Sequence, residues 1–240
     1  MDKNIFNKTE KYYHYTTFES AIKILESQKL LFSKFERLND INESYRPIFC
    51  NNKKDRNGFN SIIAQYRQIS LTIDLQYHRG FGIPAMWGHY ADDGNGACIV
   101  IDKNKLCTHI TDNNYSSGNV EYNNDYDNSI VIGDEPIKDF LQKYEHELFF
   151  KKSYDWSYEQ EFRIISKYAN ESISLKGCLI AIIIYTAIDI QQNDSIWNSL
   201  NYGILHKIEP SLPILEFSRW FGKQQLIDSN SNDWVGNCFE

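Results

Sequence analysis

Residues 11–32, KYYHYTTFESAIKILESQKLLF, show the first clear change of hydrophobic pattern along the chain. A short apolar and aromatic run at 12–15 is typical of a strand. The next stretch predicts a helix over 18–27, capped by a preceding threonine, and a second short strand at 30–32. The predicted buried face of the helix has four apolar residues at near-helical spacing: Ala21, Ile22, Ile24 and Leu25. In this arrangement His14 stands at the end of a strand, and we expect it to face a cleft.

The rest of the chain predicts helices and strands in an irregular order. Predicted helices cover 59–67, 86–90, 137–149 and 190–200. Predicted strands cover 69–73, 97–101, 160–166, 179–185, 205–208 and 215–217. Because strands and helices do not alternate regularly, a doubly wound fold is disfavoured. We predict a single α+β domain over residues 1–240, with a mixed or antiparallel sheet and flanking helices.

A polar stretch at 111–128 interrupts this pattern. It is rich in Asn, Asp and Ser, and apolar strand-like segments flank it. Such composition predicts mostly loop, with a short strand around 119–122.

Composition and charge narrow the classes of function. Of the 240 residues, 42% are hydrophobic and 24% are charged, as in ordinary globular proteins, and the net charge is −7. A negative chain is a poor non-specific ligand for nucleic acid, which is bound through clustered Lys and Arg. Neither GxGxxG nor GxxxxGK[ST] occurs, so the common dinucleotide and P-loop motifs are absent.

The distribution of apolar residues and cysteines predicts a cytoplasmic protein. The first ten residues are polar, so we expect no signal peptide. The longest apolar run, 178–185, is far shorter than the roughly 20 residues that span a bilayer, so we expect no membrane contact. The five cysteines include no CxxC pair, which favours reduced thiols and disfavours a structural zinc site.

Four segments in order carry a family resemblance. They are YHYT at 13–16, LND at 38–40 with Glu43 close behind, MWGHYAD at 86–92, and WSYEQEFR at 156–163. Together they resemble DUF2971, a bacterial family of unknown function, over about residues 12–185. The chain departs from the family pattern at Ile41, where the family often has proline.

A looser resemblance, at the level of motifs, is to ADP-ribosyltransferases. It implies that His14 and Thr16, with Tyr15 between them, hold the adenosine-side ribose of NAD. It also implies that Tyr90 stacks on the nicotinamide, with Trp87 from the same segment in the cofactor site. The two expected catalytic residues are Glu161, which contacts the ribose next to the bond that breaks, and Glu159, which activates the acceptor.

The implied chemistry fits these residue types. Breaking the nicotinamide–ribose bond builds an oxocarbenium-like transition state, which a nearby carboxylate stabilises. We therefore expect His14, Tyr90 and Glu161 to line one pocket. We also expect Glu161→Gln to remove activity with little effect on stability, because we assign Glu161 no buried cation partner.

Structural alternatives exist for the same residues. His14 would then be a half-buried histidine bonded to the backbone, and Thr16 a helix cap. Trp87 would fill the core, and Glu161 would form an ion pair with Arg163 along a strand. Asp92 and the following Asp-Gly would form an ordinary turn.

Three functions compete. The first is an ADP-ribosyltransferase or NAD glycohydrolase, with a protein or nucleic-acid acceptor and a setting in a toxin or phage-defence system that supplies a partner protein. The second is a metal-dependent hydrolase or nuclease, and the third is a non-catalytic module that senses a ligand or partner. The candidate metal ligands for the second are His14, Asp40, Glu43, His89, Asp92 and Glu161.

Overall fold

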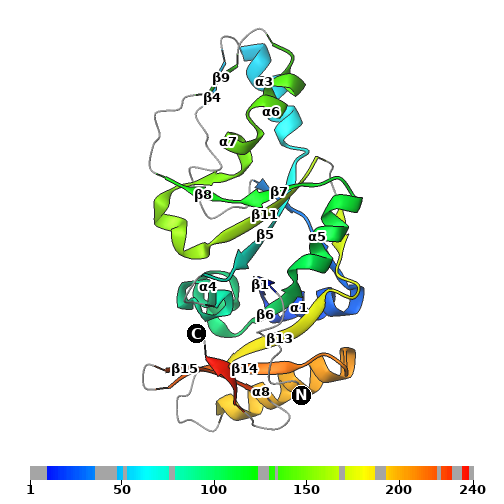
Figure 1. Cartoon of the computed structure of the whole chain (residues 1–240), viewed down its shortest axis with the longest axis vertical. Coiled ribbons are helices and arrows are strands. Elements are labelled where there is room, and N and C mark those ends of the chain that lie inside the picture. The colour runs from blue at the N-terminus through cyan, green and yellow to red at the C-terminus, as the bar shows by residue number, and fades with distance from the viewer. Residues whose placement is uncertain are drawn as a thin grey trace. The chain divides into compact units, whose positions relative to one another are not determined.

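The computed structural model describes residues 10–35, 48–50, 53–75, 79–123, 130–132, 135–167, 171–186, 193–220, 223–228 and 234–237. The chain falls into two compact units. Figure 1 labels many of the helices and strands named below. Unit 1 comprises Met1–Leu30, Leu71–Asp112 and Ile173–Glu240. Unit 2 comprises Leu31–Ser70 and Asn113–Ser172.

The predicted N-terminal strand, helix and strand are confirmed. They are β1 (Lys11–Thr16), α1 (Phe18–Ser27) and β2 (Lys29–Leu31). The cap of α1 is Thr17, whose Oγ1 accepts a hydrogen bond from the backbone N–H of Ser20 at 3.3 Å. Of the four apolar residues on the predicted inner face, Ile22 alone is only half-buried, and the spacing therefore identified the inner face of this helix.

Unit 1 is built on a mixed sheet, as predicted. Its strands follow the order β16-β15-β14-β13-β6-β1-β5. The new strands are β5 (Arg67–Ile73), β6 (Ala97–Asp102), β13 (Leu179–Thr186), β14 (Ile214–Trp220), β15 (Lys223–Asp228) and β16 (Trp234–Asn237). Among the described strand pairs of this sheet order, β13 and β14 are parallel and the other pairs are antiparallel. The last three residues of β5 belong to this unit and the first four to unit 2.

The parallel pair explains one incorrect prediction. Parallel neighbours need a crossover connection, and here helix α8 (Asn193–Ile208) supplies it and contacts both strands. The strand predicted at 205–208 is therefore wrong, since these residues form the last turn of α8. A four-residue segment with two apolar residues, Leu205 and Ile208, has too few positions to separate a strand from a helix end.

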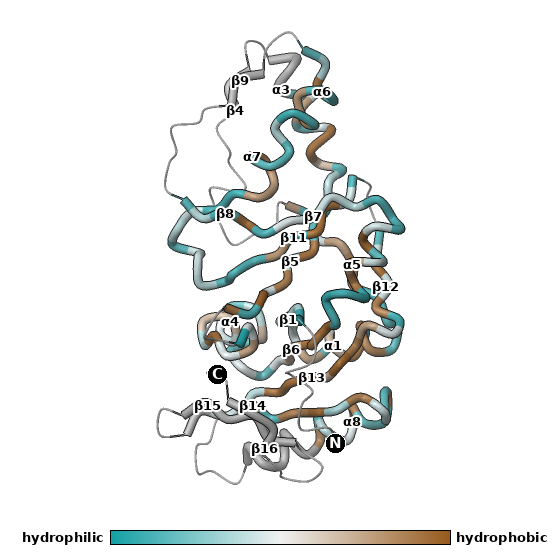
Figure 2. Tube along the Cα trace, viewed as in Figure 1, coloured by the Kyte–Doolittle hydropathy of each residue, from teal (hydrophilic) through white to brown (hydrophobic). Residues whose placement is uncertain are grey.

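The central strands of unit 1 carry its core. Every residue of β6 is buried, and β13 is apolar over most of its length, which Figure 2 shows as hydrophobic colouring along β13. Before β6 in the sequence come the 3-10 helix η2 (Gly80–Gly82), the α-helix α4 (Pro84–Tyr90) and the 3-10 helix η3 (Asp92–Gly94). After β6 comes the α-helix α5 (Lys103–Asp112).

Unit 2 is described by its own strands and helices. The strand order is β5-β11-β7, and β3 (Ser33–Lys34) also pairs with β5. The other elements are β4 (Ile48–Cys50), α3 (Lys53–Ile63), β7 (Ser116–Asn119), β8 (Glu121–Tyr122), β9 (Ile130–Ile132), α6 (Ile137–Lys143), α7 (Glu145–Phe149), β10 (Lys151–Lys152), η4 (Tyr154–Glu159) and β11 (Glu161–Ser166). Strands β4 and β9 form a parallel pair, as do β8 and β10. The remaining strand, β12 (Ser172–Ser174), pairs with β2 and belongs to unit 1 except for Ser172.

Two sequence predictions in unit 2 need correction. The helix predicted at 137–149 breaks at Tyr144, whose φ of −109° and ψ of 21° leave the helical region, and it forms α6 and α7. The polar stretch 111–128 holds more strand than expected, because β7 pairs antiparallel with β11 from Ser116 to Asn119. A cluster of buried apolar side chains joins these elements: Phe59, Tyr66, Phe140, Leu141, Leu148, Phe149, Phe150 and Ile165.

Among the described residues, none of the helices combines the length and apolar character needed to cross a bilayer.

Candidate functional site

The segment from α4 to η3 is held tightly against the sheet of unit 1. Pro84 stands in the first turn of α4, where its fixed φ suits a helix start and its missing N–H costs nothing. At the other end, a Cβ on Gly96 would lie 2.2 Å from the carbonyl oxygen of Thr16 in β1. Only glycine allows this close approach of two backbones. The segment between them therefore has a fixed position on the sheet.

Trp87 is the centre of an aromatic cluster at this segment. Its ring is buried, and its Nε1–H donates to the carbonyl oxygen of Phe81 at 2.8 Å. Its centroid lies 5.6 Å from that of Tyr185 and 5.8 Å from that of Phe217. Tyr15 meets Trp87 edge-on at 5.2 Å. Rings at these separations attract one another, so the cluster presents a rigid aromatic surface.

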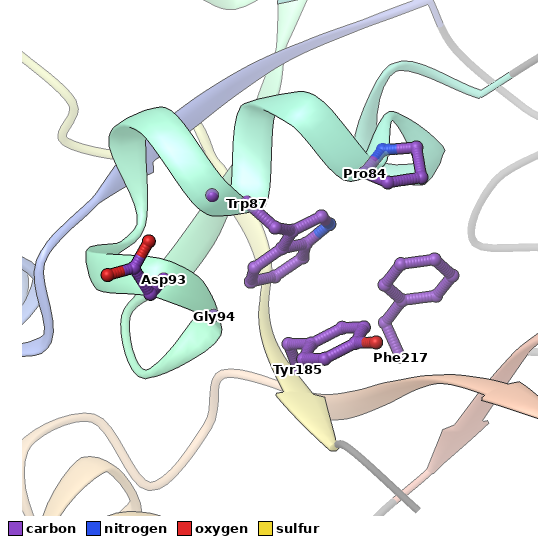
Figure 3. A pocket seen from close by; sticks show the side chains of 7 residues that line it. Pro84, Trp87, Asp93, Gly94, Tyr185 and Phe217 are labelled. Atoms are coloured by element: carbon purple, nitrogen blue, oxygen red, sulfur yellow. The ribbon is translucent and has the colours of Figure 1, made fainter.

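A pocket of about 230 Å³ opens beside this cluster, entirely within unit 1. Its lining residues come from α4, η3, β13 and β14: Pro84, Trp87, Gly88, Asp93, Gly94, Tyr185 and Phe217. Figure 3 shows the Asp93 carboxylate on one side of Trp87, with Pro84 and Phe217 on the other. The pocket therefore combines a mostly aromatic wall with one negative charge.

The turn that carries Asp93 has an unusual backbone. Asp92, Asp93 and Gly94 have φ values of 50°, 51° and 90°, so three successive residues adopt left-handed conformations. Such conformations cost free energy for residues other than glycine, although Asp tolerates them better than most. Strain of this kind gathers at functional sites. The turn predicted here is confirmed, and it places a carboxylate at the pocket.

The other residues expected to bind the cofactor do not line this pocket. Tyr15 is buried behind Trp87, and its hydroxyl donates to the carbonyl oxygen of Gly80 at 2.6 Å. His14 and Thr16 are half-buried on β1, where they pair with Ile99 and Ala97 of β6.

Within α4, the adjacent aromatic residues point differently. Tyr90 is half-buried and His89 is exposed, and neither lines the pocket, whereas Trp87 does. Of the five residues predicted to bind the cofactor, one therefore lies at the pocket.

The two glutamates predicted to be catalytic lie in unit 2, in a buried cluster of charges. Gln160 between them has a φ of 45° and joins η4, which ends at Glu159, to β11, which begins at Glu161. Both carboxylates approach one lysine. Lys152 Nζ donates to Glu159 Oε2 at 2.6 Å and lies 3.8 Å from Glu161 Oε2. Arg163 donates from Nε and Nη2 to the two oxygens of Glu161, each at 2.7 Å.

This geometry corrects the expectation that Glu161 lacks a buried cation partner. The third Arg163 nitrogen, Nη1, donates to the carbonyl oxygen of Phe149 at 2.7 Å. Burial alone raises the pKa of Glu161, but Arg163, Lys152 and Ser70 outweigh it and hold the pKa below the ordinary value. Both carboxylate oxygens are engaged by Arg163, as the ion-pair alternative predicted.

Tyr122 completes the surroundings of Glu161. Its hydroxyl accepts a hydrogen bond from the backbone N–H of Glu161 at 2.8 Å. Burial, reinforced by the nearby Glu161 carboxylate, raises the pKa of Tyr122. The phenol therefore stays neutral at physiological pH and serves as a hydrogen-bonding group.

The described residues include no group of three or more His, Cys, Asp or Glu side chains placed to hold a metal ion. Asp40 and Glu43, two of the candidate ligands, lie outside the described part of the chain, as does the LND segment. The metal-dependent alternative therefore stays a prediction.

Of the seven residues that line the pocket, sequence reasoning assigned Trp87 alone to a ligand site. Two of the six that it missed are Tyr185 and Phe217. Each lies in an apolar strand, where a core position is the natural interpretation. The parallel register of β13 and β14 pairs them directly, which brings both to the same place. A register between distant strands leaves no local signal in a sequence.

Comparison with known proteins gives one match. The model of a protein family of unknown function, DUF2971, matches residues 86–164, a stretch that begins in α4 and ends in β11. No curated protein matches the chain, and no solved structure does. Over residues 86–164, which include Trp87, Asp93 and Glu161, this chain is similar to the DUF2971 family.

Proposed function

We propose that this protein binds NAD and uses it as a substrate, with the nicotinamide ring in the aromatic pocket of unit 1. The observation that carries the proposal is the combination of Trp87, Tyr185 and Phe217 with the Asp93 carboxylate. The nicotinamide of NAD is a flat ring with a positive charge. Aromatic faces attract such a ring through cation–π interaction, and a carboxylate adds a direct charge interaction.

The size of the pocket supports a single ring. At about 230 Å³ it is smaller than the roughly 300–1,000 Å³ typical of sites that enclose a whole drug-sized ligand. A pyridinium ring would enter it, and the ribose, phosphates and adenosine would remain outside. In this arrangement the ring lies in the pocket while the bond that breaks lies at its mouth.

We assign the stabilising carboxylate to Asp93, not to Glu161. When the nicotinamide–ribose bond breaks, positive charge grows on the ribose, and a carboxylate near it lowers the barrier. Asp93 is exposed and lines the pocket, so it is accessible to a ligand. Glu161 is buried and holds Arg163 with both oxygens. We infer that Glu161 and Glu159 maintain the structure of unit 2.

The wider proposal is an ADP-ribosyltransferase-like enzyme. The ADP-ribose would pass either to water, as in an NAD glycohydrolase, or to a protein or nucleic-acid acceptor. The thiols of Cys98, Cys107 and Cys178 are free, which supports a reducing cytoplasmic setting. A role as a toxin or in phage defence, with a partner protein from such a system, would fit an enzyme that consumes NAD.

A second candidate is a non-catalytic sensor of the same ligand. The buried ion pairs of Glu159 and Glu161 favour it, because they remove the two expected catalytic carboxylates from contact with a substrate. In this case the pocket binds the ring and no bond breaks.

One experiment separates these candidates. The protein is incubated with NAD, and both released nicotinamide and bound NAD are measured. The enzyme proposal predicts release that falls by a factor on the order of 10²–10³ in Asp93→Asn. The matched control is Asp112→Asn, an exposed aspartate at the end of α5, which should keep wild-type release.

The outcomes lead to different conclusions. Binding without release supports the sensor and overturns the enzyme. Absence of both binding and release overturns the proposed ligand, and release unaffected by Asp93→Asn overturns the role of Asp93.

A further inference from the structure

Gly88 lines the aromatic pocket from the middle of α4. Glycine is a poor residue inside a helix, because it loses more backbone freedom on folding than alanine does. At a pocket wall, two properties account for such a glycine: the packing of the protein or the space that a ligand needs.

Packing gives no reason at Gly88. A Cβ built there meets no heavy atom within 4 Å beyond its chain neighbours and its own helix backbone, and its φ is not in the left-handed region. The contrast with Gly94 and Gly96 of the same segment is clear. A Cβ on Gly94 would reach Tyr185 at 3.0 Å, and one on Gly96 would reach the Thr16 carbonyl oxygen at 2.2 Å.

Gly88 is exposed and is one of the residues that line the pocket, so the open space beside it adjoins the pocket. A methyl group there would stand in open space in the free protein, at a residue of the pocket wall. Only a bound molecule would collide with it. The same substitution should therefore stabilise the free protein and obstruct the ligand.

We propose that Gly88 sets the width of the pocket, and that the ligand's ring lies directly against the backbone of α4 at this residue. This inference rests on the proposed function and specifies the ligand class, a flat cationic ring with no substituent toward the helix. Gly88 then determines specificity, since any side chain at this position would take part of the space that the ring needs.

The test compares two glycine-to-alanine variants. Gly88→Ala is the test, and Gly203→Ala is the control, because Gly203 is an exposed glycine inside α8 whose added Cβ also meets nothing within 4 Å. Both variants should melt about 2–4 °C above wild type, since both gain helix propensity without a clash. The melting temperature of each variant is measured. The Kd values of each variant for NAD and for 1-methylnicotinamide are measured by calorimetry.

The expected result is a divergence in binding. Gly88→Ala should weaken both ligands by about 10- to 100-fold, the range expected for an extra methyl group forced into a filled site. Gly203→Ala should bind as wild type does. Gly88→Ser, with a side chain one atom longer, should weaken binding at least as much as Gly88→Ala.

Two results would overturn this inference and leave the proposed function standing. If wild type binds and Gly88→Ala binds equally well, the ring does not lie at Gly88. If Gly88→Ala melts below wild type, packing requires the glycine after all. A wild-type protein that binds neither ligand overturns the proposed function itself, and this inference with it.

Discussion

Glu161→Gln provides the sharpest test of the buried charge cluster in unit 2. The substitution keeps the shape of the side chain and deletes its charge. Arg163 is then left with its guanidinium fully buried and one partner oxygen replaced by an amide nitrogen. The side chains of Glu161 and Arg163 are 4% and 0% exposed, so water cannot replace the lost interaction.

The magnitude follows from this burial. Removing one partner of a buried ion pair costs about 3–5 kcal/mol, because the remaining charge is left uncompensated in the interior. For a chain of this size each kcal/mol lowers the melting temperature by roughly 2–4 °C. Glu161→Gln should therefore melt about 6–20 °C below wild type, measured by circular dichroism.

The control is Glu19→Gln. Glu19 also forms an ion pair with a lysine, Lys23, at 2.5 Å, but their side chains are 78% and 68% exposed. Solvent screens such pairs, so the control should melt close to wild type. If Glu161→Gln also melts within about 2 °C of wild type, the cluster does not hold unit 2 together, and the reasoning is refuted.

The same pair predicts a pH dependence. The pKa of Glu161 lies below its ordinary value of 4.5, because Arg163 and Lys152 outweigh the effect of burial. A carboxyl group with a lowered pKa stabilises the fold above its unfolded-state pKa, and this contribution is lost as pH falls through the folded-state pKa. The difference in melting temperature between wild type and Glu161→Gln should be constant near neutral pH and shrink below about pH 4.5. A difference that stays constant down to pH 3 would contradict this assignment.

Four further substitutions, at three positions, test the pocket and its support. Asp93→Asn should melt as wild type does, whereas Asp93→Ala should lose about 1–2 kcal/mol of unfolding free energy. The reason is that asparagine tolerates the left-handed backbone and alanine does not. Equal melting temperatures of the two variants would argue against strain in this turn. Gly96→Ala should lower the free energy of unfolding by several kcal/mol, on the order of 3 or more, because its methyl group would overlap the Thr16 carbonyl oxygen. A variant with wild-type stability in urea would contradict this close approach. Trp87→Phe should lose about 1–3 kcal/mol of unfolding free energy, because the carbonyl oxygen of Phe81 loses the hydrogen bond from the indole N–H. It should also weaken NAD binding. Unchanged stability together with unchanged NAD affinity would remove Trp87 from the site.

Local pattern predicted much of the fold. The helix at 18–27 was predicted with correct bounds, because its apolar spacing and capping threonine are both local signals. The mixed sheet followed from irregular alternation of strand and helix patterns. The errors lie where tertiary contacts decide, as at 205–208, where a crossover between parallel strands extends α8 through a run that resembles a strand.

The candidate site was less accessible to sequence reasoning. Trp87 was predicted because it belongs to a distinctive segment, and the pocket includes it. Tyr185 and Phe217 come together only through the register of β13 and β14, which no local pattern specifies. For Glu161 the sequence offered both a catalytic role and an ion pair with Arg163. Distinguishing these roles required the distances and the burial.

The most direct test of the central claim is a crystal structure of the protein soaked with 1-methylnicotinamide, the ring of NAD with its positive charge and no other part. The proposal predicts electron density for a flat ring in contact with Trp87, beside Gly88, with the Asp93 carboxylate facing its charge. An empty aromatic pocket at a saturating concentration of this probe, or a ring bound elsewhere, would contradict the claim that this pocket receives the nicotinamide of NAD.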